Sequence, residues 1–142
     1  MTEIHEGGCV CGGTRYRVHG KPQRVSACSC AWCRKRTGSA LGISVYFLDE
    51  NVEFTQASLG RHRLTSDGGR WIDQEFCTRC GTALTWILEF LPGHRGLAGG
   101  SFDDPAFWYE IQRYVFARSK PDWLEIGSGI KTFQAMPESP DD

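Results

Sequence analysis

Seven cysteines in three short groups are the feature that most constrains how this chain folds. They form a C-x-C at 9–11, a C-x-C-x-x-C at 28–33 and a C-x-x-C-G at 77–81. An odd number of thiols excludes a fully disulfide-paired domain, so at least one sulfur has another use. Single cysteines often pack in cores as small apolar residues, but that interpretation does not explain seven clustered ones. The spacing therefore favours metal binding.

Length, charge and the first residues define the expected setting of these thiols. The 142 residues are the size of one domain, and 16 basic against 17 acidic residues give a net charge of -1. That balance provides no general attraction to nucleic acid or to an anionic membrane. The longest apolar stretches, 41–48 and 84–91, are far shorter than the roughly 20 residues of a spanning helix. The first six residues do not look like a secretory signal. We expect a cytoplasmic protein without nucleic-acid or membrane partners, in a reducing compartment where clustered thiols bind metal or react.

Short apolar runs punctuated by glycine predict a mainly β domain over 1–134. We expect strands at 14–18, 41–47, 51–54, 70–76 and 82–90. The sequence Asp103-Asp104-Pro105 is typical of a helix start, and the aromatic segment 107–116 fits a strand or a helix. The tail at 135–142 contains two prolines and three acids, which predicts disorder.

The first and last cysteine groups together supply four thiolates. Residues two apart in a strand face the same side, so a C-x-C can direct both sulfurs at one ion. In the C-x-x-C-G group the chain turns tightly, and Gly81 can adopt a positive φ without steric cost. Zinc prefers a tetrahedron of ligands with Zn–S distances of about 2.3 Å. We assign the closed, structural site, whose binding energy contributes to folding, to Cys9, Cys11, Cys77 and Cys80.

The remaining thiols are Cys28, Cys30 and Cys33. Three thiolates can hold a zinc ion and leave its fourth position open, as catalytic zinc sites do. The opposite assignment places Cys28 and Cys30 in the closed site, and spacing alone does not choose between the two. A third interpretation makes Cys30 and Cys33 a redox pair, but the βαβ context typical of such motifs is absent.

The ordered set of cysteine groups resembles the glutathione-dependent formaldehyde-activating enzyme (GFA) family, which is grouped with centromere protein V. The resemblance covers about 5–126 and rests on CVCG at 9–12, CSCAWCR at 28–34 followed by TGSA at 37–40, and FCTRCGTAL at 76–84. GSFDDP at 100–105 and SKPDW at 119–123 look like later family motifs. It implies a β-tent zinc-binding fold, like the mammalian suppressor of Sec-four, with several small antiparallel sheets and one or two short helical turns.

The resemblance also implies how the metals are divided. The residues that match the family's structural zinc ligands are Cys9, Cys11, Cys77 and Cys80. Those that match its catalytic zinc ligands are Cys28, Cys30 and Cys33. Many relatives carry histidine where this chain has Ser29 and Tyr114, and these differences bear on the identity of the substrate.

The activity implied by the resemblance is that of a carbon–sulfur lyase similar to S-(hydroxymethyl)glutathione synthase. A small thiol such as glutathione would take the open zinc position, lose its proton and add to formaldehyde or another aldehyde. Arg34 and Lys35 follow the three cysteines directly and would pair with the carboxylates of a tripeptide, or form a solvated basic turn. A hypothesis from another class is a non-catalytic zinc module that binds protein or nucleic acid. Zinc stoichiometry and its response to added thiol would discriminate between them.

Overall fold

The computed structural model describes residues 3–65 and 69–137. The chain forms two compact units, and each is described by itself. The first unit is Met1–Gln23 with Val45–Trp108, and the second is Arg24–Ser44 with Tyr109–Asp142. Of the predicted tail, 138–142 lie outside the described residues. At the start of the predicted tail, the carbonyl of Ala135 accepts a hydrogen bond from the Phe116 amide at 3.4 Å. The predictions of one domain and of a disordered tail both stay predictions.

A three-stranded antiparallel sheet in the first unit has the strand order β1-β2-β5. Its strands are β1 (Ile4–Gly8), β2 (Arg15–His19) and β5 (Val52–Gln56). Strand β2 alternates as a half-buried strand should, because Tyr16 and Val18 are fully buried while their neighbours are partly exposed. The strands predicted at 14–18 and 51–54 are thereby confirmed.

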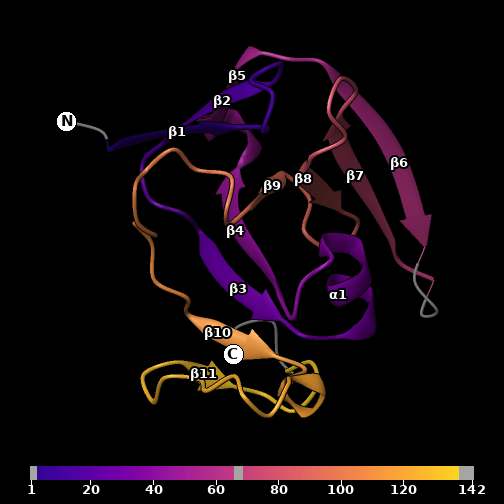
Figure 1. Cartoon of the computed structure of the whole chain (residues 1–142), viewed down its shortest axis with the longest axis vertical. Coiled ribbons are helices and arrows are strands. Elements are labelled where there is room, and N and C mark those ends of the chain that lie inside the picture. The colour runs from indigo at the N-terminus through magenta and orange to yellow at the C-terminus, as the bar shows by residue number, and fades with distance from the viewer. Residues whose placement is uncertain (1–2, 66–68, 138–142) are drawn as a thin grey trace. The chain divides into compact units, whose positions relative to one another are not determined.

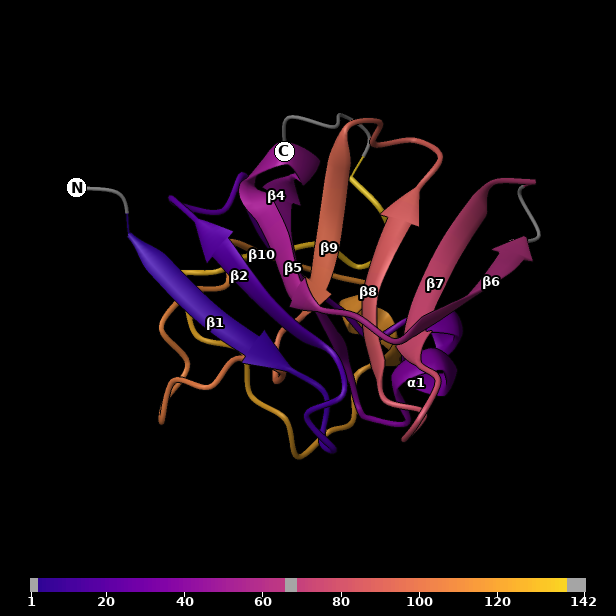
Figure 2. The same cartoon turned by 90° about the horizontal axis from the view of Figure 1, so that it is seen from above.

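A second row of strands follows the order β4-β9-β8-β7-β6, and it belongs to the first unit from Val45 of β4 onward. Figure 2 shows β9, β8 and β7 side by side. The strands are β4 (Gly42–Leu48), β6 (Leu59–Thr65), β7 (Trp71–Cys77), β8 (Ala83–Leu88) and β9 (His94–Ala98), and a 3-10 turn, η1 (Asp49–Asn51), follows β4. Their core side chains include Phe47, Leu84, Trp86 and Leu97. The predicted strands at 41–47, 70–76 and 82–90 are confirmed, whereas polar β6 escaped prediction.

Charged side chains link the neighbours of β7. Its two buried acids, Asp73 and Glu75, each have a cationic partner. Arg63 on β6 donates to both oxygens of Asp73 at 2.7 and 3.0 Å, and Arg95 on β9 donates to Glu75. A buried carboxylate is costly unless it is paired, so these pairs favour one register for the strand that ends at Cys77.

The predicted helix start at Asp103-Asp104-Pro105 is wrong, since 103–112 contains no helix. Asp103 has other partners. Its carboxylate pairs with Arg15, and its amide donates to the carbonyl of Glu6 at 2.8 Å. With its side chain engaged on β2, this aspartate does not cap a helix.

The second unit contains three short strands that pair in parallel. Strand β10 (Arg113–Val115) lies between β3 (Arg24–Cys28) and β11 (Lys131–Thr132), as Figure 1 shows. The expectation of antiparallel sheets is therefore wrong here, and the long connections between these strands permit parallel pairing. Of the aromatic segment 107–116, only β10 is regular structure.

The core of the second unit is small and built around Tyr114. Ala27 and Ala117 are buried against it, and aliphatic side chains including Leu41 and Ile111 pack around them. Two helical turns complete the unit, α1 (Ala31–Thr37) and η2 (Ala117–Ser119). Within the described part of the chain, no helix is long and apolar enough to cross a membrane.

Candidate metal centres

Two tight turns in the first unit position four cysteines. Strand β1 ends at Gly8, so Cys9 and Cys11 lie in a turn. The expectation that they lie in a strand is therefore wrong. The Gly12 amide donates to the Cys9 carbonyl at 3.2 Å, and Gly12 has a φ of 77°. At the other turn the Gly81 amide donates to the Cys77 carbonyl at 2.8 Å. Gly81 has a φ of 81°, which confirms the predicted positive φ.

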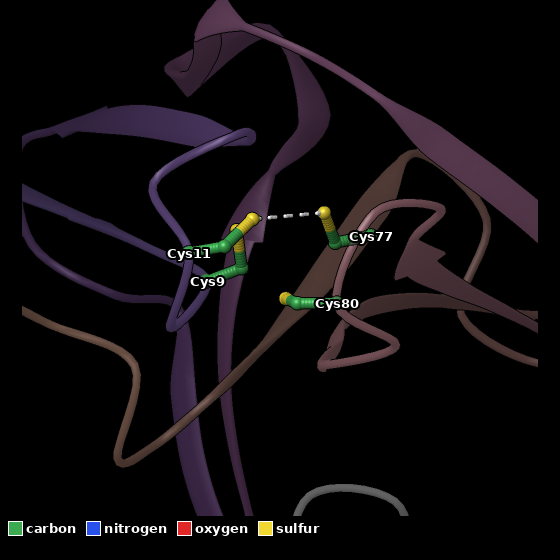
Figure 3. Close-up of side chains that lie close together, drawn as sticks. All are labelled: Cys9, Cys11, Cys77 and Cys80. Carbon is green, nitrogen blue, oxygen red and sulfur yellow. Dashed lines mark hydrogen bonds between the residues drawn. The ribbon is translucent and has the colours of Figure 1, made fainter.

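The two turns aim their sulfurs at one point, as Figure 3 shows. The Sγ atoms of Cys9 and Cys11 are 3.6 Å apart, and those of Cys11 and Cys77 are 3.8 Å apart. The Sγ atom of Cys80 completes the group, and all four sulfurs lie within 4.8 Å of one another. A tetrahedron with Zn–S bonds of about 2.3 Å has S–S edges of about 3.8 Å. This tetrad, as we call Cys9, Cys11, Cys77 and Cys80, therefore fits a zinc ion with four thiolate ligands.

Hydrogen bonds shift the pKa values of the tetrad thiols in different directions. For Cys11 the Gly13 amide lowers the pKa, but hydrogen bonds with the neighbouring thiols and burial together raise it to about 11. The Thr14 amide donates to Cys9 Sγ and the Gly13 amide to Cys11 Sγ, both at 3.3 Å. The hydroxyl of Thr82 lies 3.1 Å from Cys80 Sγ. This hydroxyl and the Thr82 amide lower the pKa of the Cys80 thiol to about 5. Sequence reasoning missed Thr82, although a hydroxyl two residues after the last cysteine was a usable signal.

Three cysteines meet where β3 passes into α1 in the second unit. Cys28 is the last residue of β3, and Cys30 is the N-cap of α1, where its sulfur accepts from the Cys33 amide at 3.3 Å. The C-x-x-C spacing thus places two sulfurs at the first turn of a helix. The helix ends at Thr37 and is capped by Gly38, whose φ is 68°. Sequence reasoning did not predict α1, even though its basic last turn and the following glycine are helix-end signals.

The sulfurs of this triad, as we call Cys28, Cys30 and Cys33, lie within 4.8 Å of one another, and each residue is half-buried. The pKa of the Cys30 thiol is lowered, first because Cys28 and Cys33 donate hydrogen bonds to its sulfur and then because backbone amides do. Three close thiols that favour a shared negative charge are a donor set suited to zinc.

A buried hydrogen-bond chain supports the triad from behind. The Ser29 hydroxyl donates to the Ala40 carbonyl at 3.0 Å, so the Tyr114 hydroxyl must be the donor in its own bond to Ser29. Ser29 and Tyr114 are 0% and 1% exposed. Their bond connects β10 to the residue between two triad cysteines. Ser29 and Tyr114, the two positions where many relatives carry histidine, are thus direct hydrogen-bond partners.

The two predicted substrate contacts differ in their surroundings. Arg34 donates from Nε to the Ser29 carbonyl at 3.0 Å while its side chain remains exposed. Lys35 is also exposed, at the next position of α1. Their predicted contact with substrate stays a prediction.

Comparison with known proteins identifies the family. The sequence model described as "Glutathione-dependent formaldehyde-activating enzyme" matches residues 4–118, which include all seven cysteines. The chain belongs to the glutathione-dependent formaldehyde-activating enzyme family. The GFA resemblance seen in the cysteine groups is thus confirmed.

Two further similarities accompany the GFA match. A protein of Halomonas elongata, named "Putative glutathione-dependent formaldehyde-activating enzyme", is 32% identical over 136 residues, covering 87% of this chain and 81% of that protein. A crystal structure of a Rhodobacter sphaeroides protein matches with a TM-score of 0.57 and 18% identity, covering 75% of this chain and 96% of that one. At that identity the second similarity concerns the fold alone.

Proposed function

We propose that this GFA-family protein catalyses the addition of glutathione to formaldehyde, giving S-(hydroxymethyl)glutathione, and that it acts in the reverse direction as a carbon–sulfur lyase. The observation that carries the proposal is the triad. Its three sulfurs lie close together, and the described residues offer no fourth Cys, His, Asp or Glu ligand beside them. Such a donor set leaves room for a thiol from outside.

The residues of the triad have separate tasks in this proposal. Cys28, Cys30 and Cys33 would hold a zinc ion, and the buried bond between Ser29 and Tyr114 keeps the segment between the first two ligands in place. A zinc ion bound to three thiolates has one position for a further ligand and lowers the pKa of a thiol that binds there. The amide of Cys33 donates to Cys30 Sγ, which stabilises negative charge on that sulfur.

The proposed reaction is an addition without oxidation or reduction. An electron pair of the glutathione sulfur forms the new C–S bond to the formaldehyde carbon. The π pair of the C=O bond moves to oxygen, and the proton lost by the thiol ends on that oxygen. All atoms of both reactants are kept in the product.

The tetrad has a structural task in the proposal. Its four ligands come from the protein, so no position is open to substrate. Because Cys11 and Cys77 are 66 residues apart, an ion bound there would link the two chain segments of the first unit. Its binding free energy then contributes to folding.

The test measures zinc content and catalysed exchange on the same purified protein. Glutathione and formaldehyde also combine without a catalyst, so the rate of exchange between free and sulfur-bound formaldehyde is followed by NMR with and without protein. We expect two zinc ions per chain, and faster exchange with wild type but not with Cys30→Ser. One zinc ion per chain, inert to glutathione, with no change in the exchange rate would refute the proposal and favour a non-catalytic zinc module.

A further inference from the structure

Helix α1 carries three basic residues in a row, and they lie on different sides of the helix. Its half-buried positions are Trp32, Cys33 and Arg36, while its other four residues are exposed. Positions three and four apart share one face of a helix, so the half-buried positions form a stripe that carries both a triad sulfur and a cation. Arg34 and Lys35 lie on the exposed side. Arg36 is therefore the basic residue of α1 that shares a face with the triad.

The side chain of Arg36 is close enough to act on Cys33. Residues three apart on a helix have Cβ atoms about 5–6 Å from each other. The Nε atom of Arg36 is buried, so that end of the guanidinium is shielded from solvent. A hydrogen bond with Cys28 lowers the pKa of the Cys33 thiol, but a hydrogen bond with Cys30 and burial raise it overall. The positive charge of Arg36 acts in the lowering direction, which means that it stabilises a thiolate at Cys33.

A half-buried group of thiolates needs a positive charge beside it. A zinc ion with three thiolate ligands carries one net negative charge, and a fourth thiolate adds another. Negative charge away from water is costly unless a cation compensates it. Arg34 is exposed and its Nε donates to the Ser29 carbonyl at 3.0 Å, and Lys35 is exposed as well. Among the described residues of α1, Arg36 alone combines a positive charge with the half-buried face of the triad.

We propose that Arg36 is a positioning residue of the triad, whose charge compensates the anionic metal–thiolate group and so sets how tightly the three cysteines hold zinc. It acts through Cys33 and needs no contact with substrate. The same charge favours a further thiolate ligand, because it offsets the negative charge that this ligand adds. The inference rests on the proposed function of the triad and adds a cation to its three sulfurs. If the basic residues only complemented the dipole at the end of α1, Arg36 and Lys35 would be equivalent.

The experiment measures zinc affinity by competition with a chromogenic chelator in the absence of substrate. The release step that is missing in Cys30→Ser belongs to the triad. Arg36→Gln removes the charge and should lower the zinc affinity of the triad about 10- to 100-fold, as the loss of an outer partner of a metal site does. Arg36→Lys keeps the charge, and Lys35→Gln is the matched control that removes the neighbouring charge on the exposed side. Both should stay within about threefold of wild type, because an exposed charge is screened by solvent and salt.

Salt separates an effect of charge from an effect of packing. The Debye length falls from about 30 Å at about 0.01 M salt to about 3 Å at about 1 M, so the difference in zinc affinity between wild type and Arg36→Gln should shrink over that range. A difference that persisted at high salt, or an equal loss of affinity in Arg36→Lys or Lys35→Gln, would overturn the inference.

The exchange assay distinguishes this inference from the proposed reaction. If Arg36→Gln binds zinc more weakly as expected but wild type does not speed the exchange of formaldehyde, the role of Arg36 stands and the reaction fails. If wild type speeds the exchange while Arg36→Gln keeps its zinc affinity, the reaction stands and the role of Arg36 is overturned.

Discussion

The tetrad and the triad are both clusters of cysteines, but the chain builds them in opposite ways. The tetrad joins two turns whose residues Cys11 and Cys77 are 66 positions apart. The triad lies within six consecutive residues at the junction of β3 and α1. Closing a long loop restricts the unfolded chain more than closing a short one. An ion in the tetrad should therefore stabilise the fold, whereas under the proposed function an ion in the triad would serve mainly the reaction.

The largest effect is expected for Cys77→Ser. Cys77 is fully buried at the end of β7, and the variant leaves the tetrad one ligand short. The free energy of unfolding should fall by about 3–5 kcal/mol, because binding of a structural zinc ion is part of folding. Chemical denaturation and zinc content measure this. A variant that kept both its zinc and its midpoint would contradict a structural role for the tetrad.

The second prediction concerns activity at the other cluster. Cys30→Ser should lower the rate of thiol turnover by more than about 100-fold. Losing a residue that only supports a metal ligand typically costs about 10- to 100-fold, and Cys30 is a ligand itself in this proposal. Its melting temperature should stay within about 3 °C of wild type, since the ligands it disturbs are local. Circular dichroism and the exchange assay give the two readouts. Equal unfolding by Cys30→Ser and Cys77→Ser would remove the difference between the clusters.

The third prediction tests what holds the triad from behind. Ser29→Ala leaves the buried Tyr114 hydroxyl without its partner and should cost about 1–3 kcal/mol. Adding Tyr114→Phe removes that unpaired group and should recover part of the loss, while Tyr114→Phe alone should cost about 1 kcal/mol. Urea unfolding of the four proteins in this cycle measures the coupling. Strictly additive losses would show that the two hydroxyls do not act as a pair.

The smallest effect is expected for the pH-dependent ion pair between Arg63 and Asp73, which lies on β7, the strand that ends at Cys77. The guanidinium of Arg63 holds the pKa of Asp73 below its ordinary value, so the pair stabilises the fold above about pH 4 and this contribution is lost as pH falls through the lowered pKa. Arg63 is more than half exposed, so solvent screens the pair. Asp73→Asn should lower the melting temperature by roughly 1–3 °C at pH 7.

The control for this effect is the same comparison at lower pH. The difference between wild type and Asp73→Asn should shrink as the pH falls through the lowered pKa of Asp73, because its side chain then becomes neutral like that of asparagine. A difference that persisted below that pKa would come from packing and not from charge.

Several elements escaped prediction for identifiable reasons. Strand β6 has little apolar patterning, because Arg61 and Arg63 face acids on β7 and so serve as cross-strand partners. Helix α1 is only seven residues long and owes its start to a cysteine cap. The predicted helix after Asp103 is absent because that carboxylate pairs with Arg15 on a distant strand. In each case the deciding partner lies on another strand or belongs to the metal site.

The sequence by itself determined which sulfurs form each local group. Spacing within C-x-C and C-x-x-C is set by the geometry of a single turn, which depends on neighbouring residues and on glycines such as Gly81. The sequence also identified the family, because the three cysteine groups occur in an order that is specific to it.

Only the tertiary structure decided which groups meet. Spacing left open whether Cys9 and Cys11, or Cys28 and Cys30, share an ion with the last pair, and the structure brings Cys9 and Cys11 to Cys77 and Cys80. It likewise brought Tyr114 to Ser29 behind the triad. Such encounters depend on the pairing and packing of segments far apart in the chain, and short-range propensity contains no information about them.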